Sequence, residues 1–366
     1  MKPLIAVALS GGIDSLVAAD LLQKQNHRIV GLHFITGYET DTDCTSGSVP
    51  SPAAGIESFD YFKTCALKKL APIADQLDIE IDIVDCRKQF QSAVVDYFIR
   101  TYRNGKTPNP CLFCNPRIKF GTLLEAAIKR GASGLATGHY ALINKDSTGR
   151  FHLYKGVDPF KEQSYFLAML SQAQLAQACF PLGGMTKSDV VKLAGKRKLF
   201  PADRKESQDI CFIKNNGYGA FLDSQPEFSP LPGLIEDTGG TVLGRHQGLH
   251  LFTIGQRRGI NCPAAEPYYV IRLDRQRNCL VVGWKKDLLT EECHVENINW
   301  INKRPKKPIE TQVRLRYRHK EVSAKLYPMA GNCAKIRFAV SQEAVTPGQG
   351  AVFYENDEVL GGGWIK

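Results

Sequence analysis

Long hydrophobic runs are missing from this chain. No apolar stretch in its 366 residues reaches the roughly 18 residues that cross a bilayer, so we expect no membrane partner. The apolar residues 4–9 run into Ser10-Gly11-Gly12 and not into a cleavage-like segment, so we expect no signal peptide and a cytoplasmic protein. With 43% hydrophobic and 23% charged residues, the composition excludes a disordered chain, and the length indicates two or three domains.

A regular disulfide framework is also missing. Eleven cysteines is an odd number, and they do not follow the spacing of a small secreted domain. We therefore expect reduced thiols, most of them buried as small apolar side chains.

Acidic residues are fewer than basic ones: the chain has 37 Asp and Glu and 47 Lys and Arg, for a net charge of +10. Residues 301–320 hold eight basic side chains and one acidic one, and residues 187–205 hold seven basic and two acidic ones. Two such stretches favour a polyanionic partner such as a nucleic acid, although a solvated face is the alternative. Arg314, Arg316 and Arg318 at period two predict three guanidinium groups on one side of a strand, with Tyr317 on the other.

The periodicity predicts an α/β fold, with a doubly wound parallel sheet over residues 1–205. We expect a small central domain over 206–285 and a C-terminal β-barrel over 286–366, with a strand over 313–317. Within the first domain, the patterns predict strands at 4–9, 28–34, 79–84 and 134–137, helices at 15–25, 59–77, 89–102, 117–130 and 187–198, and loops at 36–58 and 104–116.

The turn after the first strand, Ser10-Gly11-Gly12-Ile13-Asp14-Ser15, precedes a helix. Glycines and unpaired N–H groups at that place favour phosphate, whereas Asp14 would repel it unless Mg²⁺ bridges the charges. No Gly-Lys-Ser/Thr follows, so a Walker A loop is excluded, and a plain glycine-rich turn is the alternative. The hexapeptide resembles the PP-loop of ATP pyrophosphatases, which implies cleavage of ATP to AMP and pyrophosphate with adenylation of a carbonyl oxygen.

Three cysteines stand out. Cys111 and Cys114 follow a proline-rich loop, and Arg117 and Lys119 nearby would lower the pKa of the Cys114 thiol. Cys211 lies far along the chain. A zinc knuckle would need four ligands where only one C-x-x-C exists, and a redox dithiol is a further alternative.

The chain resembles the tRNA-specific 2-thiouridylase (MnmA) family over its whole length. Besides the PP-loop, the matching motifs are GKTPNP at 105–110, CN at 114–115, IKF at 118–120, ATGHY at 136–140, KEQSYF at 161–166, ESQDIC at 206–211, FTIGQR at 252–257 and VTPGQ at 345–349. The resemblance implies an enzyme, a tRNA-uridine 2-sulfurtransferase that makes 2-thiouridine at the wobble position 34 of tRNAs for Lys, Glu and Gln.

The resemblance also implies roles for individual residues. ATP would be surrounded by Ala8, Leu9, Ser10, Gly11, Gly12, Ile13, Asp14, Ser15, Phe34 and Gly138. Cys114 would be the nucleophile and Cys211 the persulfide carrier, with sulfur from a persulfide relay protein or inorganic sulfide. The target base would face Asn109, Pro110 and Cys111, and tRNA would contact His139, Lys161, Glu162, Gln163, Arg316, Tyr317 and Gln349.

The chain departs from the family at two places. Many members have Asp where this chain has Cys111, and the resulting set of Cys111, Cys114 and Cys211 could instead hold a [4Fe–4S] cluster that carries the sulfide. The segment 36–58, around Cys44, matches the family poorly, so donor recognition could differ there. Two rival functions are another PP-loop enzyme, such as a tRNA lysidine synthetase or an amidating ligase, and a non-catalytic RNA-binding protein.

Overall fold

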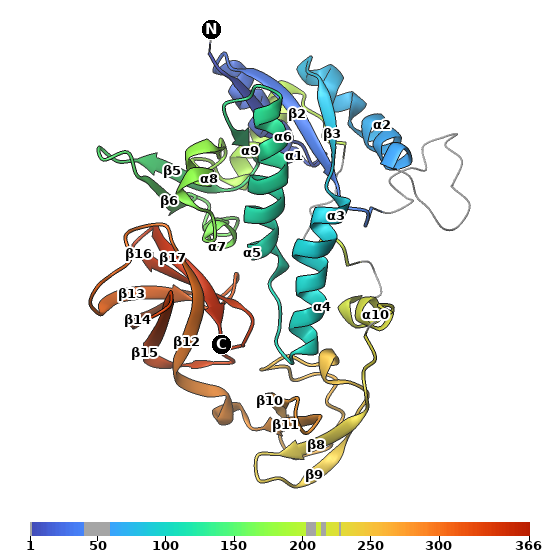
Figure 1. The fold of residues 1–366 in the computed structure, drawn as a ribbon, viewed down its shortest axis with the longest axis vertical. Helices are drawn as coiled ribbons and strands as arrows, with labels where there is room; N and C mark the ends of the chain where they lie inside the picture. The colour runs from blue at the N-terminus through green and yellow to red at the C-terminus, as the bar shows by residue number, and fades with distance from the viewer. Residues whose placement is uncertain (1, 40–58, 203–209, 214–216, 227) are drawn as a thin grey trace. The chain divides into compact units, whose positions relative to one another are not determined.

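The computed structural model describes residues 2–39, 59–202, 210–213, 217–226 and 228–366, and forms two compact units (Figure 1). Unit 1 comprises Met1–Val94, Cys111–Phe212 and Asp357–Val359, and unit 2 comprises Val95–Pro110, Ile213–Asn356 and Leu360–Lys366. Most of the predicted loop at 36–58, including Cys44, lies outside the described residues, and so do residues 206–209 of the segment that leads to Cys211.

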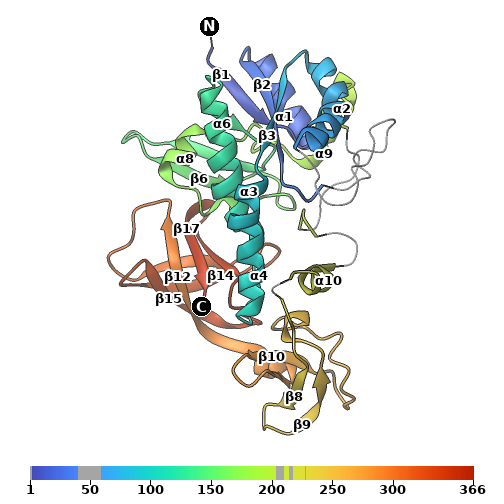
Figure 2. The ribbon, with the colours of Figure 1, turned by 45° about the vertical axis from the view of Figure 1, so that its right-hand side comes forward.

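Unit 1 is built on a five-stranded parallel sheet with strand order β3-β2-β1-β4-β7. This confirms the predicted doubly wound α/β fold, because each parallel pair requires a crossover through a helix or a longer connection. Helices α1, α2 and α9 cover one face, where they share a buried core with β1 (Figure 2). The strands are β1 (Leu4–Ala8), β2 (Arg28–Ile35), β3 (Ile81–Asp85), β4 (Leu135–Ala136) and β7 (Ala178–Cys179).

The helices of unit 1 agree in large part with the predicted ones. The predicted helix at 59–77 matches α2, and the predicted helix at 187–198 is α9. Hairpin β5 (Ala141–Lys145) and β6 (Phe151–Lys155) pairs with Glu358 and Val359 at the start of β17. The helices are α1 (Ile13–Lys24), α2 (Phe59–Leu77), α3 (Arg87–Phe90), the π-helical η2 (Gln91–Val95), α5 (Pro110–Cys114), the π-helical η3 (Asn115–Leu123), α6 (Leu124–Lys129), α7 (Ser164–Leu167), α8 (Gln172–Gln177) and α9 (Lys187–Arg197).

The predicted loop at 104–116 is wrong over its second half. A helix begins at Pro110, and α5, η3 and α6 follow one another without a break. Proline is well suited to the first helical position, because its fixed φ matches a helix and its missing N–H would have no partner there. Cys111 and Cys114 therefore lie on a helix and not on a loop.

Unit 2 contains a small sheet with strand order β10-β11-β8-β9, around a core that includes Ile235, Val270 and Leu280. This confirms the predicted central domain as a small folded sheet. Its elements are α10 (Gly217–Asp223), β8 (Gly233–Asp237), β9 (Val242–His246), η4 (Leu249–Leu251), β10 (Tyr269–Asp274), β11 (Cys279–Gly283) and η5 (Lys285–Leu288), and α4 (Asp96–Arg103) also belongs to unit 2.

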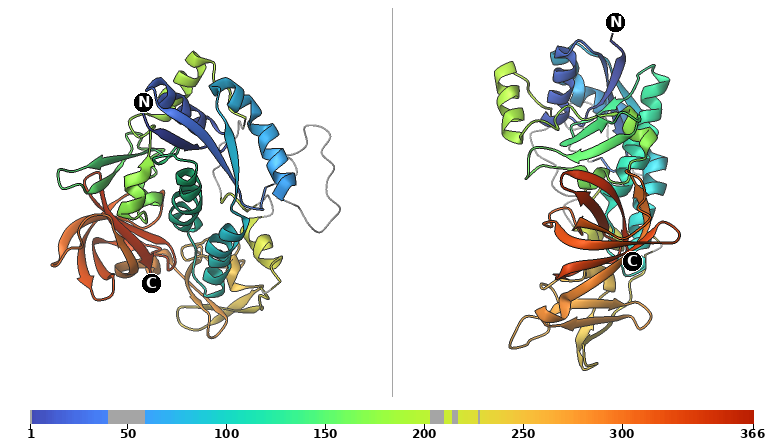
Figure 3. Two further views of the ribbon diagram at one scale, coloured as in Figure 1. Left: turned by 45° about the horizontal axis from the view of Figure 1, so that its top comes forward. Right: turned by 90° about the vertical axis from the view of Figure 1, so that its left-hand side faces the viewer.

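The C-terminal strands form a closed barrel, as predicted. Neighbours follow the order β12-β15-β14-β13-β16-β17, and pairing of β17 with β12 closes the ring (Figure 3). Its interior is filled by apolar side chains such as Val313, Leu326 and Phe353. The strands are β12 (Leu289–Trp300), β13 (Ile309–Arg314), β14 (Val322–Met329), β15 (Cys333–Glu343), β16 (Gly350–Glu355) and β17 (Glu358–Ile365).

The predicted strand over 313–317 is too long. Strand β13 ends at Arg314, and Arg316 and Tyr317 lie in the turn that leads to β14. Arg314 is half-buried, because it pairs with Glu321 at 2.5 Å and lies over the Tyr354 ring. The three arginines at period two therefore do not share one side of a strand.

No helix in the described part of the chain is long and apolar enough to cross a membrane.

Replacing Thr186 with Ala should lower the free energy of unfolding by about 1 kcal/mol, because Thr186 and Asp189 form a reciprocal capping box at the start of α9. Denaturant unfolding would measure the loss. Thr186→Ser keeps the hydroxyl and should behave like the original protein, whereas equal losses in both variants would contradict this role of the cap.

Candidate active site

The turn after β1 has the geometry of an anion-binding site. Gly11 has a φ of +89°, and Ser15 Oγ donates to the Gly12 carbonyl at 3.0 Å, which closes the turn. Gly12 caps α1 without a side-chain hydrogen bond, so the N–H groups of the first helical turn can donate to a phosphate. Ser10 and Ser15 reinforce the turn through their hydroxyls, 3.3 Å apart.

Gly138, just after β4, lies against this turn, and Phe34 lies on the strand next to β1. A Cβ on Gly138 would lie 2.9 Å from the Asp14 carbonyl carbon and from the Ser15 nitrogen, so only glycine fits there. Phe34 lies near the end of β2, next to β1, in a sheet where Ala8 pairs with Leu32. The structure thus brings Gly138 against the predicted ATP-binding turn and places Phe34 on the neighbouring strand.

Asp14 has two partners that the sequence did not reveal. Its Oδ1 accepts hydrogen bonds from Tyr140 Oη and from Lys187 Nζ, each at 2.7 Å. Lys187 is the first residue of α9. The Lys187 backbone N–H also donates to Asp158 Oδ2 at 2.7 Å. The lysine offsets the negative charge that would otherwise repel phosphate from this turn.

Cys111 and Cys114 lie one turn apart on α5, and side-chain amides brace the helix that follows. Pro116 has no N–H to donate to a carbonyl one turn back. The Asn115 side-chain amide donates instead to the Cys111 carbonyl at 3.1 Å and to the Phe166 carbonyl at 3.0 Å. Gln174 donates to the Pro116 and Phe120 carbonyls at 2.7 and 2.9 Å.

Cys211 belongs to the same compact unit as Cys111 and Cys114, and ionised Cys211 would raise the pKa of Cys114, as ionised Cys111 would raise that of Cys211. Its neighbour Phe212 is buried, with its ring 5.8 Å from Tyr38 and 5.7 Å from Phe90 in edge-on contacts. This aromatic anchor holds the segment while the Cys211 side chain is exposed.

The expected low pKa of the Cys114 thiol is wrong for the structure described. Burial raises its pKa to about 12, and the Lys119 ammonium opposes this shift without overcoming it. Burial likewise raises the pKa of Cys111, and the surrounding protein raises that of Cys211 to about 11 although its side chain reaches solvent. Cys86, fully buried, is a fourth thiol, which when ionised would raise the pKa of Cys114, and no pattern in the sequence singled it out.

The cysteines are not arranged as a metal site. Within the described ranges, no group of three or more His, Cys, Asp or Glu side chains is placed to hold a metal ion. The set of Cys111, Cys114 and Cys211 therefore does not fit a [4Fe–4S] cluster in this structure, since a cluster needs its thiolates gathered around one centre.

The residues of unit 1 that were predicted to contact tRNA are held by other parts of the chain. His139 is buried, and its two ring nitrogens lie 2.7 Å from Thr137 Oγ1 and 3.2 Å from Lys119 Nζ. Glu162 is also buried, and it accepts a hydrogen bond from the Ser164 N–H at 2.6 Å, at the start of α7. Gln163 accepts from the Tyr140 N–H at 3.1 Å, and the Lys161 N–H donates to Asp158.

The other predicted residues belong to unit 2. Gln349 donates to the Thr107 and Pro108 carbonyls at 3.2 and 2.9 Å, and the Asn109 N–H donates to Tyr97 Oη at 3.2 Å. These contacts fix the segment that ends at Pro110, which is buried. Arg316 is exposed in its turn, and Tyr317 is half-buried.

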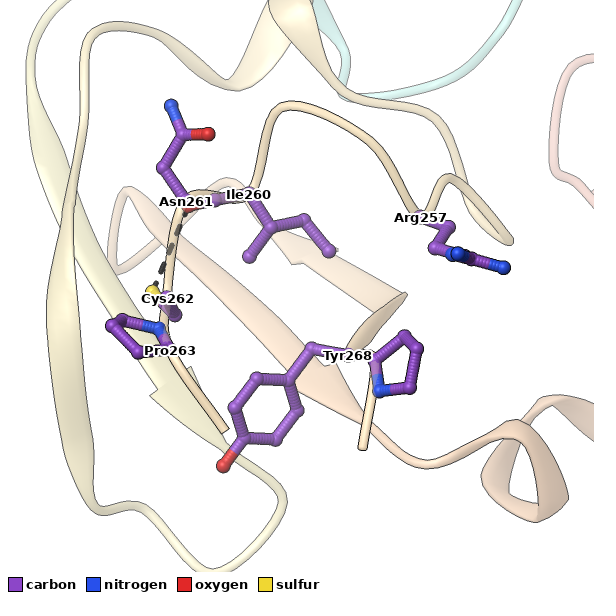
Figure 4. Close-up of a pocket in the computed structure, with 7 residues that line it drawn as sticks. Arg257, Ile260, Asn261, Cys262, Pro263 and Tyr268 are labelled. Carbon is purple, nitrogen blue, oxygen red and sulfur yellow. Dashed lines mark hydrogen bonds between the residues drawn. The ribbon is translucent and has the colours of Figure 1, made fainter. Parts of the chain in front are cut away.

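An open cavity of about 430 Å³ lies in the central domain (Figure 4). Its lining consists of Arg257, Ile260, Asn261, Cys262, Pro263, Pro267 and Tyr268. The Tyr268 ring is stacked on Trp284 at 4.7 Å. In the part of the chain that the structure describes, none of the site residues predicted from the sequence lines this cavity.

The parallel sheet and the glycine turn that precedes α1 define a nucleotide-binding α/β domain of the HUP class. Three families match consecutive parts of the chain: the tRNA methyl transferase HUP domain at residues 3–215, the tRNA methyl transferase PRC-barrel domain at 220–284 and the aminomethyltransferase beta-barrel domain at 290–365. A HUP domain of this kind implies the use of ATP.

Curated relatives match over the full length. The chain is 49% identical to the tRNA-specific 2-thiouridylase MnmA of Desulfosudis oleivorans, with 100% of this chain and 95% of the relative covered. It is 42% identical to the MnmA of Geobacter metallireducens, with 99% and 96% covered, and 40% identical to that of a Nostoc species, with 99% and 98% covered. The chain therefore belongs to the tRNA-specific 2-thiouridylase MnmA family, whose members are sulfurtransferases.

Gly138→Ala should weaken ATP binding at least about tenfold, since the added methyl group must displace the backbone of Asp14 and Ser15. Titration calorimetry with ATP and Mg²⁺ would measure the dissociation constant. Gly195→Ala is the matched control, because a Cβ there meets nothing within 4 Å. Unchanged ATP affinity in Gly138→Ala would contradict the close approach of Gly138 to the turn.

Alkylation of Cys114 by iodoacetamide should rise about tenfold per pH unit from pH 7 to 10 without levelling off, because burial keeps its pKa near 12 and only the thiolate reacts. Peptide mass spectrometry would follow the modified residue, with glutathione as a thiol that levels off near pH 9. A plateau for Cys114 below pH 9 would contradict the raised pKa.

Proposed function

We propose that this chain uses ATP to replace the C2 oxygen of the wobble uridine, position 34, with sulfur in tRNAs for Lys, Glu and Gln. The observation that carries the proposal is the occurrence, in one compact unit, of an anion-binding turn after β1 and a cluster of thiols around Cys114. Full-length similarity to 2-thiouridylases supports the same reaction. A lysidine synthetase or an amidating ligase would use the turn but would not need the thiols.

The first step would be adenylation. The C2 carbonyl of uracil is amide-like and a poor electrophile, so attack of its oxygen on the α-phosphate of ATP, with release of pyrophosphate, creates a good leaving group. The first turn of α1 would bind phosphate through backbone N–H groups, and Lys187 would add a positive charge beside it.

Mg²⁺ fits this turn as a partner of Asp14. One carboxylate together with substrate phosphates is a usual way to hold this ion, and Asp14 is partly exposed beside the turn. Bound Mg²⁺ would neutralise phosphate charge. Lys187 and Tyr140 would orient the Asp14 carboxylate.

The second step would transfer sulfur. A donor that carries a persulfide would load Cys211, and the exposure of Cys211 supports access by a protein donor, with inorganic sulfide as the other source. The Cys114 thiolate would then attack the Cys211 sulfur of the persulfide, which forms a Cys114–Cys211 disulfide and releases hydrosulfide. Hydrosulfide would add to C2 and AMP would leave with the oxygen; an external thiol reductant would reopen the disulfide.

The base must leave the anticodon stack for this chemistry, because C2 is not accessible between stacked neighbours. Asn109, Pro110 and Cys111 stand at the start of the helix that carries Cys114, and we propose that they receive the flipped uracil. The exposed Arg316 in the turn after β13 is suited to a phosphate contact, and the net charge of +10 favours an RNA partner.

A [4Fe–4S] cluster on Cys111, Cys114 and Cys211 is the alternative sulfur carrier. The arrangement of the three thiols does not favour it, since they form no metal-holding group among the residues described. The two schemes differ in their need for Cys111. The cluster would need Cys111 as a ligand, whereas the persulfide reaction transfers electrons and sulfur without it.

Cys114→Ala and Cys211→Ala should each reduce 2-thiouridine formation more than about a hundredfold and leave the first-turnover release of pyrophosphate within about threefold, because adenylation does not need the thiols. Nucleoside mass spectrometry of the tRNA and pyrophosphate release would measure the two steps. Cys111→Ala should keep most of its activity, and Cys333→Ala, in the barrel, is the control.

Two results would contradict this scheme. Full 2-thiouridine formation by both alanine variants would show that neither thiol is needed for sulfur transfer, and pyrophosphate release without 2-thiouridine in the original protein would indicate a PP-loop enzyme of another kind. Loss of activity in Cys111→Ala, together with about four irons per original chain, would favour the cluster.

A further inference from the structure

Lys119 lies on the π-helical segment that follows Cys114. In an α-helix, a residue five positions on would point about 140° away, because each residue turns by 100°. A π-helix bonds residue i to i+5, which brings the fifth residue back toward the same face. The change from α5 to η3 therefore turns Lys119 toward the side of the helix that carries Cys114.

A buried histidine fixes the Lys119 ammonium. Lys119 Nζ lies 3.2 Å from His139 Nε2, and since an ammonium can only donate, Nε2 accepts and the ring is neutral. Burial and the Lys119 charge together hold the pKa of His139 well below its usual range. The Nδ1–H then donates to Thr137 Oγ1 at 2.7 Å.

The His139 ring has little freedom to move. The Phe180 ring meets it edge-on at 5.9 Å, and the Phe120 ring lies 6.5 Å away. In the described ranges no carboxylate forms an ion pair with Lys119. Its charge is thus held in place by a neutral acceptor and is not cancelled.

The same charge acts on three thiols. Lys119 lowers the pKa of Cys111, of Cys114 and of Cys211, in each case against the larger opposite effect of burial. The other groups that face Cys114 are thiols, namely Cys86, Cys111 and Cys211, and each of them, when ionised, makes the Cys114 thiolate less favourable.

We propose that Lys119 is the cation that stabilises the thiolates of the sulfur-transfer site, and that His139 is a positioning residue which, with Thr137, holds Lys119 toward the cysteines. This inference rests on the proposed function for its biological sense, because the thiolate of Cys114 is the species that attacks the persulfide. The thiol proton passes to solvent, and no other reactant is needed. His139 thereby acts inside the protein through Lys119, in place of the tRNA contact predicted for it.

The test compares alkylation of Cys114 and Cys211 at pH 8 in the free protein, without ATP, tRNA or sulfur donor. Lys119→Gln removes the charge but keeps an N–H donor for His139, and Cys114 should react roughly tenfold more slowly, the effect of about one pH unit in pKa. Lys119→Arg keeps the charge and should react within about threefold of the original protein. Alkylation of Cys333 in the barrel should be the same in every variant, which controls for unfolding.

A second pair of variants tests the positioning role. His139→Leu removes the acceptor and should slow alkylation of Cys114, whereas His139→Gln places an amide oxygen near the former Nε2 and should restore most of the rate. The pH profile of tRNA thiolation should shift to higher pH by about one unit in Lys119→Gln. A merely structural role for His139 would slow alkylation of Cys114 by the same factor in the Lys119→Gln background, whereas a positioning role that acts through Lys119 predicts that His139→Leu adds little there.

Equal alkylation rates in Lys119→Gln and the original protein would overturn the proposal, and so would equal rates in His139→Leu and His139→Gln. The proposed function has a separate test. It is contradicted if the original protein makes no 2-thiouridine from tRNA, ATP and a persulfide donor, whatever the alkylation rates.

Discussion

The helix that carries Cys111, Cys114 and Lys119 is held by side-chain amides next to Pro116, which has no backbone N–H. Pro116 cannot donate to a carbonyl one turn back, and Asn115 donates to the Cys111 carbonyl at the point where the helix continues as the π-helical η3. Gln174 supplies two more donors to the same helix. This bracing sets where Cys111, Cys114 and Lys119 lie relative to one another. Without it, Lys119 would point away from the thiols that it is proposed to stabilise.

Burial and charge act against each other at the thiols. Burial raises the pKa of Cys114 to about 12, so the resting thiol is protonated and a poor nucleophile, while Lys119 reduces that shift. A protonated thiol is also less readily oxidised, which suits the proposed disulfide that closes only during sulfur transfer. Cys211 is exposed, which suits its proposed role as a persulfide carrier that has to meet its donor. In the glycine turn after β1, charges are also paired, since Lys187 Nζ donates to Asp14 Oδ1 at 2.7 Å.

Local patterns predicted most of the fold, and they supplied the candidate residues of the site. The apolar run before the glycine turn, the period of α2 and the Thr186 cap of α9 are short-range signals, and each produced the expected element. The helix that begins at Pro110 was missed because a proline-rich stretch reads as a loop unless proline takes the first helical position. The pairing of Lys187 with Asp14 and the burial of His139 arise from packing between segments far apart in sequence, so no local pattern contained them. Burial of the thiols also arises from packing between distant segments. The basic residues near Cys114 in the sequence therefore led to the wrong direction for its pKa.

A single-turnover experiment with the Cys211 persulfide tests the central claim most directly. The protein would be loaded with one labelled sulfane sulfur, mixed with ATP, Mg²⁺ and unmodified tRNA, and quenched in acid. Mass spectrometry would then count 2-thiouridine, AMP and cysteine pairs. The account predicts that labelled 2-thiouridine, AMP and the Cys114–Cys211 disulfide form in equal amounts and at the same rate. Labelled 2-thiouridine without that disulfide, or AMP without transfer of the label, would contradict it.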